Sequence, residues 1–227
     1  MRTQFSKLAL AAALVLALVF TFSCSNDDGG DSNSSKIVYG PSVNYGGETY
    51  KTVVIGTQTW MARNLNYGSY RYCYDNLNVN CNKYGGLYDW ATAMALPESC
   101  NTSYCSSQIR AKHQGICPPG WHIPSAEEWT TLTDFVGNNA GTKLKAISGW
   151  GSNGNGTDAY GFSALPGGLA ANYVGFNYGG QIGFWWGSSE TSTKKASYLR
   201  MKYDSEGASY MTILDKDFFI SVRCLKD

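Results

Sequence analysis

The chain has 227 residues with 18 Lys and Arg against 17 Asp and Glu, a formal net charge of +1. This near-neutral balance, without a basic cluster, argues against nucleic acid as a partner. A charged fraction of 15%, together with 26 Gly, 16 Tyr and 7 Trp, is typical of a loop-rich, aromatic-rich extracellular domain. The length suffices for one domain with a sizeable core.

The N-terminal residues carry the pattern of an exported protein. Two basic residues precede an uncharged apolar run from residue 8 to 22. The run is shorter than the about 20 residues of a membrane span and suits the core of a secretory signal. The stretch TFSC, residues 21–24, resembles a bacterial lipoprotein cleavage box. We therefore expect residues 1–23 to be a signal peptide and Cys24 to carry a lipid; a secreted protein with a spare cysteine is the alternative.

Residues 24–35 follow with a polar run, SNDDGGDSNSS, that has no large apolar side chain. Such a segment buries too little surface to offset the entropy of ordering, so we expect a flexible tether before a folded domain at 36–227. The run resembles the acidic stretch of surface-displayed lipoproteins in some Gram-negative phyla. We therefore expect an outer-membrane lipoprotein of the cell envelope, exposed on the surface and held to the membrane by its lipid.

Six further cysteines lie in the expected domain. An even number in an exported chain indicates disulfides, although fifteen pairings are possible. Proximity favours two short-range bonds, each closing a polar loop, and a third bond between the remaining two cysteines. The pairs are then Cys73–Cys81, Cys100–Cys105 and Cys117–Cys224. The third would remove the most unfolded-state entropy, on the order of 4 to 5 kcal/mol in the chain-entropy model.

Hydrophobic patterning predicts a hairpin and then a first helix. β-Branched residues on both sides of Gly56 indicate a hairpin within residues 50–65, followed by an Asn-rich loop. A helix should follow and end before Pro97, with an apolar face made of Leu87, Ala91, Met94 and Ala95. A second disulfide-bearing loop is expected over residues 99–116.

The stretch GICPPGWHIPSAEEW, residues 115–129, holds residue types that serve as nucleophile, base and acid in enzymes, at Cys117, His122, Glu127 and Glu128. It also contains a capping-box pattern, Ser125 with Glu128, that opens a second helix. The apolar face of this helix is expected at Trp129, Leu132, Phe135 and Val136, before Gly137 ends it. Because Cys117 is expected in a disulfide, we interpret the stretch as scaffold, with a Cys/His/Glu enzyme as the alternative.

The C-terminal half divides into an irregular part and a strand-rich part. Residues 149–187 are glycine-rich with few helix or strand signals, which predicts a long loop region. Alternation around two turns in residues 198–227 predicts a three-stranded antiparallel meander. Strands at both ends with helices between them indicate an α+β domain whose ends meet in one sheet.

Seven blocks of the sequence together carry a resemblance to a known family. They are VIGTQTWMARNL, YGGLYDWATAM, GICPPGWHIPSAEEWTTL, GTKLKAISGW, NGTDAYGFSALPGG, FWWGSSE and SVRCLKD. Over about residues 50–227 they resemble the Fibrobacter succinogenes major paralogous domain, found in surface and secreted bacterial proteins. That family is similar to the C-type lectin fold and to the formylglycine-generating sulfatase activators. The resemblance implies an α+β, C-type-lectin-like domain with antiparallel sheets, two helices, a long loop region and paired terminal strands.

Neither a metal site nor a catalytic site is indicated. The formylglycine-generating relatives use a copper-binding cysteine pair, and here only the two short-range pairs, in polar loops, could serve. The calcium motifs of C-type lectins are missing, and residues 153–158, NGNGTD, lack the spaced acids of a calcium loop. We therefore expect no cofactor, no bound metal and no enzyme, with calcium left open.

Recognition by exposed aromatic side chains remains, since such surfaces stack on sugar rings or bind partners. Adjacent tryptophans on a strand point to opposite faces, so we expect one of Trp185 and Trp186 in the core and one accessible. The expected ligand-binding residues are Asn172, Tyr173, Phe176, Asn177, Tyr178, Trp185 and Trp186. The other tryptophans, Trp60, Trp90, Trp121, Trp129 and Trp150, are expected in the core.

The sequence thus predicts a non-catalytic binding module for extracellular polysaccharide or a surface protein. A structural or adhesin subunit without a small ligand is the alternative, and a formylglycine-generating oxidase is the second alternative.

Overall fold

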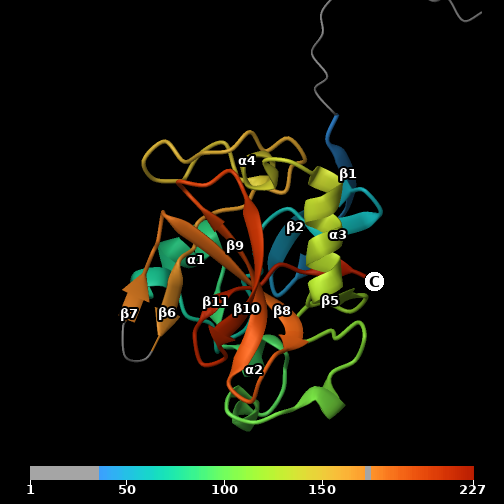
Figure 1. The fold of residues 1–227 in the computed structure, drawn as a ribbon, viewed down its shortest axis with the longest axis vertical. Helices are drawn as coiled ribbons and strands as arrows, with labels where there is room; N and C mark the ends of the chain where they lie inside the picture. Colours follow the sequence, from blue (N-terminus) through green and yellow to red (C-terminus); the bar gives the residue numbers. More distant parts are fainter. Residues whose placement is uncertain (1–35, 172–174) are drawn as a thin grey trace, which may run out of the picture. The chain divides into compact units, whose positions relative to one another are not determined.

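Two five-stranded sheets form the framework of the domain (Figure 1) in the computed structural model, which describes residues 36–171 and 175–227. The first sheet has the order β1-β2-β3-β12-β5 and the second β10-β9-β8-β11-β4. Their strands are β1 (Val38–Tyr45), β2 (Glu48–Ile55), β3 (Gln58–Met61), β4 (Leu87–Tyr88), β5 (Trp121–His122), β8 (Ile182–Glu190), β9 (Lys195–Lys202), β10 (Ala208–Asp215), β11 (Ile220–Ser221) and β12 (Leu225–Lys226). A separate hairpin pairs β6 (Leu169–Ala171) with β7 (Gly175–Asn177).

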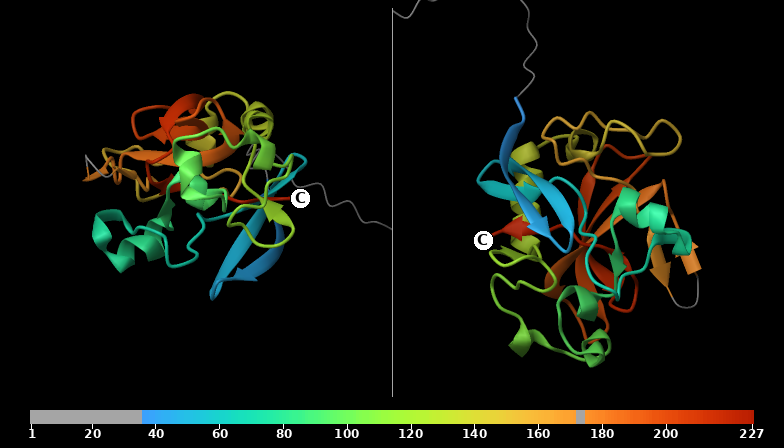
Figure 2. Two further views of the ribbon diagram at one scale, coloured as in Figure 1. Left: turned by 90° about the horizontal axis from the view of Figure 1, so that it is seen from below. Right: turned by 180° about the vertical axis from the view of Figure 1, so that it is seen from behind.

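Helices connect and cover the sheets. They are α1 (Asn78–Tyr84), α2 (Trp90–Ala93), α3 (Ala126–Val136) and α4 (Ala140–Leu144), with 3-10 turns at Tyr74–Asn76, Glu98–Asn101 and Ser106–Gln108. The longest, α3, packs against β2 of the first sheet and against β8, β9 and β10 of the second. The β1–β2 hairpin lies at the outer edge of its sheet (Figure 2). None of the helices within the described ranges is long and apolar enough to cross a membrane.

The α+β class predicted from the sequence is confirmed, and strands from both ends of the domain meet in one sheet, because β12 pairs with β3. The hairpin around Gly56 is confirmed as β2 and β3. Two details differ from the expected plan. Four α-helices occur in the described residues where two were expected, and β11 pairs with β8 in parallel.

The two predicted helices have different outcomes. α3 begins at Ser125 with both capping-box hydrogen bonds and ends at Gly137, as predicted. Phe135 is wrong as a core residue, because it is 55% exposed. The first helix is shorter than predicted: Leu87 belongs to β4, Asp89 caps α2, and Ala95 has a φ of 52° that takes the chain out of the helix before Pro97.

Two predictions for the C-terminal half are wrong. Residues 149–187 are not irregular throughout, since they include β6, β7 and the first part of the nine-residue strand β8. The meander is confirmed only as the β9–β10 hairpin. Its expected third strand is split, because β11 joins β8 and β4 in the second sheet whereas β12 crosses to the first sheet and pairs with β3 and β5.

The core consists of two apolar clusters. One surrounds Trp90 and Trp186, and the other surrounds Trp60, Trp129 and Trp185. The rings of Trp60 and Trp129 stack with centroids 4.7 Å apart, which ties the first sheet to α3. The prediction that five tryptophans lie in the core is confirmed for Trp60, Trp90, Trp121, Trp129 and Trp150.

A buried arginine joins the two sheets beside these clusters. Arg223 lies between β11 and β12, and its Nε and Nη2 donate to Asn64 Oδ1 at 3.0 and 2.7 Å. The same oxygen accepts from Trp185 Nε1 at 2.7 Å. Burial lowers the pKa of Arg223 to about 9, so the guanidinium remains charged at neutral pH. The buried guanidinium therefore needs acceptor oxygens, and its contacts fix the point at which the chain crosses between the sheets.

All three predicted disulfides are confirmed, and they differ widely in loop length. Cys117–Cys224 spans 107 residues, Cys73–Cys81 spans 8 and Cys100–Cys105 spans 5. Cys117 precedes β5 and Cys224 precedes β12, so this bond fixes the strands at which the domain closes. The two short bonds each clip a surface loop.

We predict that removing Cys117–Cys224 with alanine at both positions lowers the free energy of unfolding by about 4 to 5 kcal/mol, because the longest loop is released in the unfolded state. Removing Cys73–Cys81 in the same way should cost only about 2 to 3 kcal/mol. Denaturant titrations of both double variants provide the measurement. Equal losses for the two pairs would contradict the loop-length explanation.

Candidate binding site

Three of the four residues that suggest catalysis are engaged in the frame, and the fourth, Glu127, is exposed. Cys117 is bonded to Cys224 and supplies no thiolate. His122 is fully buried, with Nδ1 2.7 Å from Asp227 Oδ1 and Nε2 2.9 Å from Glu128 Oε1. The other oxygen of Glu128 accepts from the backbone N–H of Ser125 at 2.8 Å. One network therefore links β5, the cap of α3 and the C-terminal strand.

The pKa values in this network are shifted toward a charged pair. Burial lowers the pKa of His122, but its hydrogen bonds to Glu128 and Asp227 raise it more, so that it lies above its ordinary value of 6.5. Burial raises the pKa of Glu128, but hydrogen bonds from His122 and Ser125 lower it further, to below its ordinary value of 4.5. Both shifts stabilise the charged forms of His122 and Glu128 relative to the unfolded chain.

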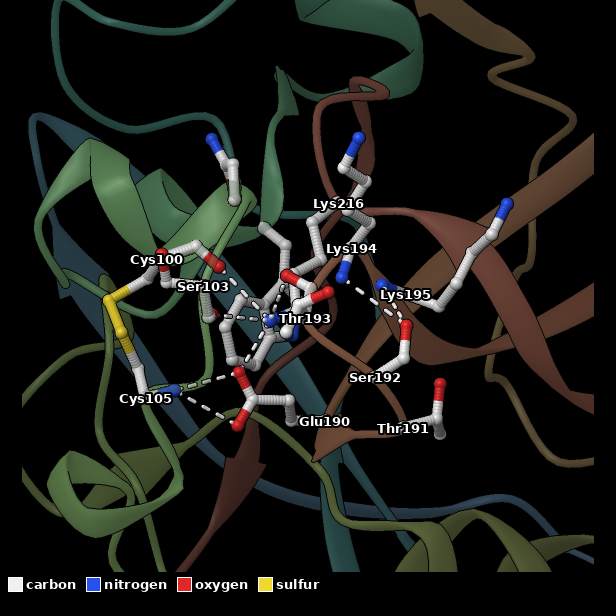
Figure 3. Close-up of polar contacts among 12 residues, drawn as sticks. Cys100, Ser103, Cys105, Glu190, Thr191, Ser192, Thr193, Lys194, Lys195 and Lys216 are labelled. Carbon is white, nitrogen blue, oxygen red and sulfur yellow. Dashed lines mark hydrogen bonds and ion pairs between the residues drawn. A yellow bond between two sulfur atoms is a disulfide. The ribbon is translucent and has the colours of Figure 1, made fainter.

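A second buried ion pair holds two loops at the end of β8. The ammonium of Lys216 is fully buried and contacts Glu190 Oε1 (Figure 3). It also donates to the carbonyl oxygens of Cys100, Ser103 and Thr193 at 3.0, 3.2 and 3.2 Å. It lies 4.4 Å from the centre of the Trp90 ring. Three N–H donors thus face four oxygens, and the charge is balanced inside the protein.

Glu190 extends this network to the Cys100–Cys105 clip. Both of its carboxylate oxygens accept from the backbone N–H of Cys105, at 2.9 and 3.1 Å. Figure 3 shows the Glu190 carboxylate joined to the Cys105 nitrogen on one side and to the Lys216 ammonium on the other. Because one carboxylate binds both a lysine and a disulfide loop, the position of residues 99–111 depends on a buried charge.

Next to this loop lies a polar groove of about 350 Å³, here called the Phe219 groove. It is lined by Asp89, Glu98, Ser99, Asn101, Thr102, Asp217 and Phe219. Asp89 Oδ1 accepts from Asn101 Nδ2 at 2.9 Å and from the N–H of Thr92, so part of the lining is fixed by the cap of α2. Within the described ranges, Glu98 and Asp217 are exposed and form no ion pair.

Aromatic side chains border the Phe219 groove. The rings of Phe219 and Tyr72 lie 4.4 Å apart, and Tyr72 is 44% exposed. Phe219 also pairs through its backbone with Ala170 of β6, which places the β6–β7 hairpin next to it. On β7, Phe176 packs on the ring of Tyr74 at 5.3 Å. The loop closed by Cys73–Cys81 and the hairpin therefore form one partly exposed aromatic surface.

The predicted ligand-binding residues are only partly accessible. The prediction that one of Trp185 and Trp186 is exposed is wrong: both are 0% exposed, because β8 is covered on one face by α3 and on the other by α2 and β4 residues. Their indole N–H groups donate to Asn64 Oδ1 and to the carbonyl of Tyr88.

The remaining predicted positions lie on or beside the hairpin. Phe176 is half-buried, Tyr178 is 49% exposed, and Asn177 pairs with Leu169 in the hairpin. Asn172 and Tyr173 lie outside the described residues, as does Cys24. Four residues at this surface were not predicted from the sequence: Tyr72, Glu98, Asp217 and Phe219. A signal was present in DKDFF, residues 215–219, where an aromatic pair follows a charged turn.

The candidate calcium loop is occupied by its own chain. Asp158 Oδ1 accepts from the N–H of Ser163 at 2.7 Å, and Asn155 Oδ1 accepts from the N–H of Trp150 at 3.0 Å. Across residues 36–171 and 175–227, no group of three or more His, Cys, Asp or Glu side chains is placed to hold a metal ion.

Comparison with known proteins identifies a family. The sequence model described as the Fibrobacter succinogenes major domain matches residues 53–226. The chain belongs to this family. The resemblance predicted from the seven sequence blocks is confirmed. The matched range includes the second sheet, the first sheet without β1 and the start of β2, the helices α1 to α4 and the Phe219 groove. No curated protein and no solved structure matches the chain.

We predict that the Lys216→Met variant of this family member loses about 3 to 5 kcal/mol of unfolding free energy, because Glu190 stays buried without its partner. The double variant Lys216→Met/Glu190→Gln should regain part of this loss, since no charge is then stranded. Lys202→Met, which breaks an exposed pair with Asp204, is the control and should cost less than about 1 kcal/mol. If Lys216→Met loses no more unfolding free energy than Lys202→Met does, the Lys216–Glu190 pair does not stabilise the fold.

We also predict a pH dependence from His122. A raised folded-state pKa stabilises the protein fully below pH 6.5, and this contribution is lost as the pH rises through the folded-state pKa. The unfolding free energy of the wild type minus that of His122→Asn should therefore fall with rising pH. Denaturant titrations above pH 4.5 keep Glu128 ionised and measure this difference. A constant or rising difference would contradict the assignment.

Proposed function

We propose that the protein is a non-catalytic binding module of the cell envelope that recognises extracellular polysaccharide through the Phe219 groove. The observation that carries the proposal is the half-exposed Phe219–Tyr72 ring pair beside a groove lined by unpaired carboxylates. Aromatic faces pack on the C–H faces of sugars, and carboxylates accept hydrogen bonds from their hydroxyl groups. Both kinds of contact meet at Phe219.

The rigid lining supports recognition. Asn101 is held by two hydrogen bonds, since its Nδ2 donates to Asp89 and its Oδ1 accepts from the N–H of Ala91 at 2.9 Å. The Cys100–Cys105 clip and Lys216 hold the adjoining backbone. A preorganised groove loses little conformational entropy when a ligand binds.

The N-terminal sequence supports the location in the envelope. The apolar run, the TFSC stretch and the polar tether are the pattern of a lipoprotein. We therefore include in the proposal a lipid on Cys24 and display of the domain at the outer-membrane surface. Globomycin-sensitive processing and loss of membrane association in Cys24→Ala would test this part.

A surface protein is the second candidate ligand, with a structural or adhesin subunit as its extreme form. It is favoured by an apolar groove of about 660 Å³ that is lined by Val38, Ile55, Phe135 and Tyr160, among others, beside the edge strand β1. Exposed apolar surface of this kind is typical of protein contacts. The oxidase alternative requires a cysteine pair that binds copper, and all six cysteines in the described ranges are in disulfides.

We predict that the domain binds a subset of glycans on a polysaccharide array and that Phe219→Ala and Tyr72→Ala each weaken binding about three- to tenfold. Each variant removes one ring face, worth about 0.5 to 1.5 kcal/mol. Tyr39→Ala, an exposed tyrosine on β1, is the matched control and should bind as the wild type does. Silence of the wild type across the array would instead favour the structural subunit.

A further inference from the structure

A second groove, of about 430 Å³, lies at the other part of the disulfide loop and is here called the Ser188 groove. Its lining comes from three elements: the loop after Cys105, the beginning of α3 and the end of β8. The residues are Ser106, Ile109, Arg110, Ala111, Ser125, Glu127, Ser188, Ser189 and Glu190. It shares no lining residue with the Phe219 groove, yet residues 99–111 supply a wall to each.

The floor of the Ser188 groove is fixed by contacts already made. Glu190 is held by Lys216 and by the N–H of Cys105. The N–H of Ser188 donates to the carbonyl of Pro124 at 2.9 Å, which locks the end of β8 against the start of α3. The Ser189 hydroxyl accepts from the N–H of Ala126 at 3.4 Å. These groups are positioned before any ligand arrives.

One polar group in this floor, the Ser188 hydroxyl, is available for a ligand. Ser188 is only 4% exposed, and what remains exposed opens on the groove. Its hydroxyl has no hydrogen-bond partner among residues 36–171 and 175–227, whereas Ser125 accepts from the N–H of Glu128. Ser188 Oγ is not one of the fully enclosed side-chain atoms without a partner in the described residues, so it is open to the groove, and a ligand hydroxyl can hydrogen-bond to it there.

The charges on the rim select the kind of ligand. Arg110 and Glu127 are exposed on separate elements, and neither forms an ion pair within the described part of the chain. An anion would face Glu127, and a cation would face Arg110. A neutral molecule with several hydroxyl groups satisfies both, because each hydroxyl donates to a carboxylate or accepts from a guanidinium. Half-buried Ile109 offers an apolar contact for C–H groups.

We infer that the Ser188 groove binds one neutral sugar residue, with Ser188, Arg110 and Glu127 as its polar contacts. The volume lies in the range of small-ligand sites. This inference rests on the proposed polysaccharide recognition and adds a second contact point on the opposite part of the same loop. The sugar hydroxyl at Ser188 both donates and accepts, and no bond is made or broken.

The test titrates the uniformly ¹⁵N-labelled domain with millimolar methyl glycosides of glucose, galactose, mannose, xylose and N-acetylglucosamine and follows amide chemical shifts. We expect at least one neutral glycoside to shift the amides of Ser188, Ser189 and Glu127. Ser188→Ala and Glu127→Gln should each raise its dissociation constant about three- to tenfold. Ser107→Ala, an exposed serine of the same loop that does not line the groove, is the control and should leave the constant unchanged.

The outcomes separate this inference from the proposed function. Glycoside shifts confined to residues of the Phe219 groove would overturn the inference and leave polysaccharide recognition in place. Shifts at the Ser188 groove that survive both substitutions would also overturn it. If no glycoside shifts an amide and the domain binds nothing on the polysaccharide array, both proposals are wrong. Unchanged thermal unfolding of Ser188→Ala would show that a loss of binding does not come from a loss of fold.

Discussion

The buried ammonium of Lys216 is the constraint on which the candidate surface depends. A lysine charge that is fully buried must be surrounded by oxygens, because desolvation is otherwise too costly. Here those oxygens come from Glu190, from two carbonyls of the disulfide loop and from the turn before β9. The disulfide loop, residues 190–193 and the segment of Lys216 are distant in sequence and are thereby brought to one point. Each groove takes a wall from one of them, so the geometry of both follows from where a single charge is neutralised.

Most of the chemically reactive side chains have structural roles in the framework of sheets and loops. The six cysteines of the described ranges are in disulfides, His122 is held between two carboxylates, and Glu128 divides its oxygens between His122 and the cap of α3. What remains exposed is of another kind: unpaired carboxylates, an arginine, hydroxyl groups and partly exposed rings. A stiff frame with polar and aromatic side chains on its surface is suited to binding at a low entropic cost.

Features that depend on residues close together in the sequence were predicted correctly. The capping box of α3, the Gly56 hairpin and the two short disulfides each depend on residues close in sequence, and a few hydrogen bonds or one loop closure decide them. The sequence did not predict that β11 and β12 join different sheets. This depends on the contact of Arg223 with Asn64, which lie 159 positions apart and meet only in the folded core. For Trp185 and Trp186, alternation correctly places them on opposite faces of β8. The alternation of side chains along a strand does not predict that other elements cover both of its faces.

The turn between β10 and β11 explains why frame and surface cannot be separated. Within residues 215–219 the N–H of Phe218 donates to the carbonyl of Asp215, and this turn directs Lys216 inward while leaving Asp217 exposed. Phe219 is then held by two backbone hydrogen bonds to Ala170 of β6. The buried charge and the groove aromatic are three residues apart on one short, doubly anchored segment. Any change that moves Lys216 must move Phe219, whereas a change at Asp217 alters the charge of the groove without touching the ion pair. Stability and recognition therefore share a backbone at this turn but use different side chains.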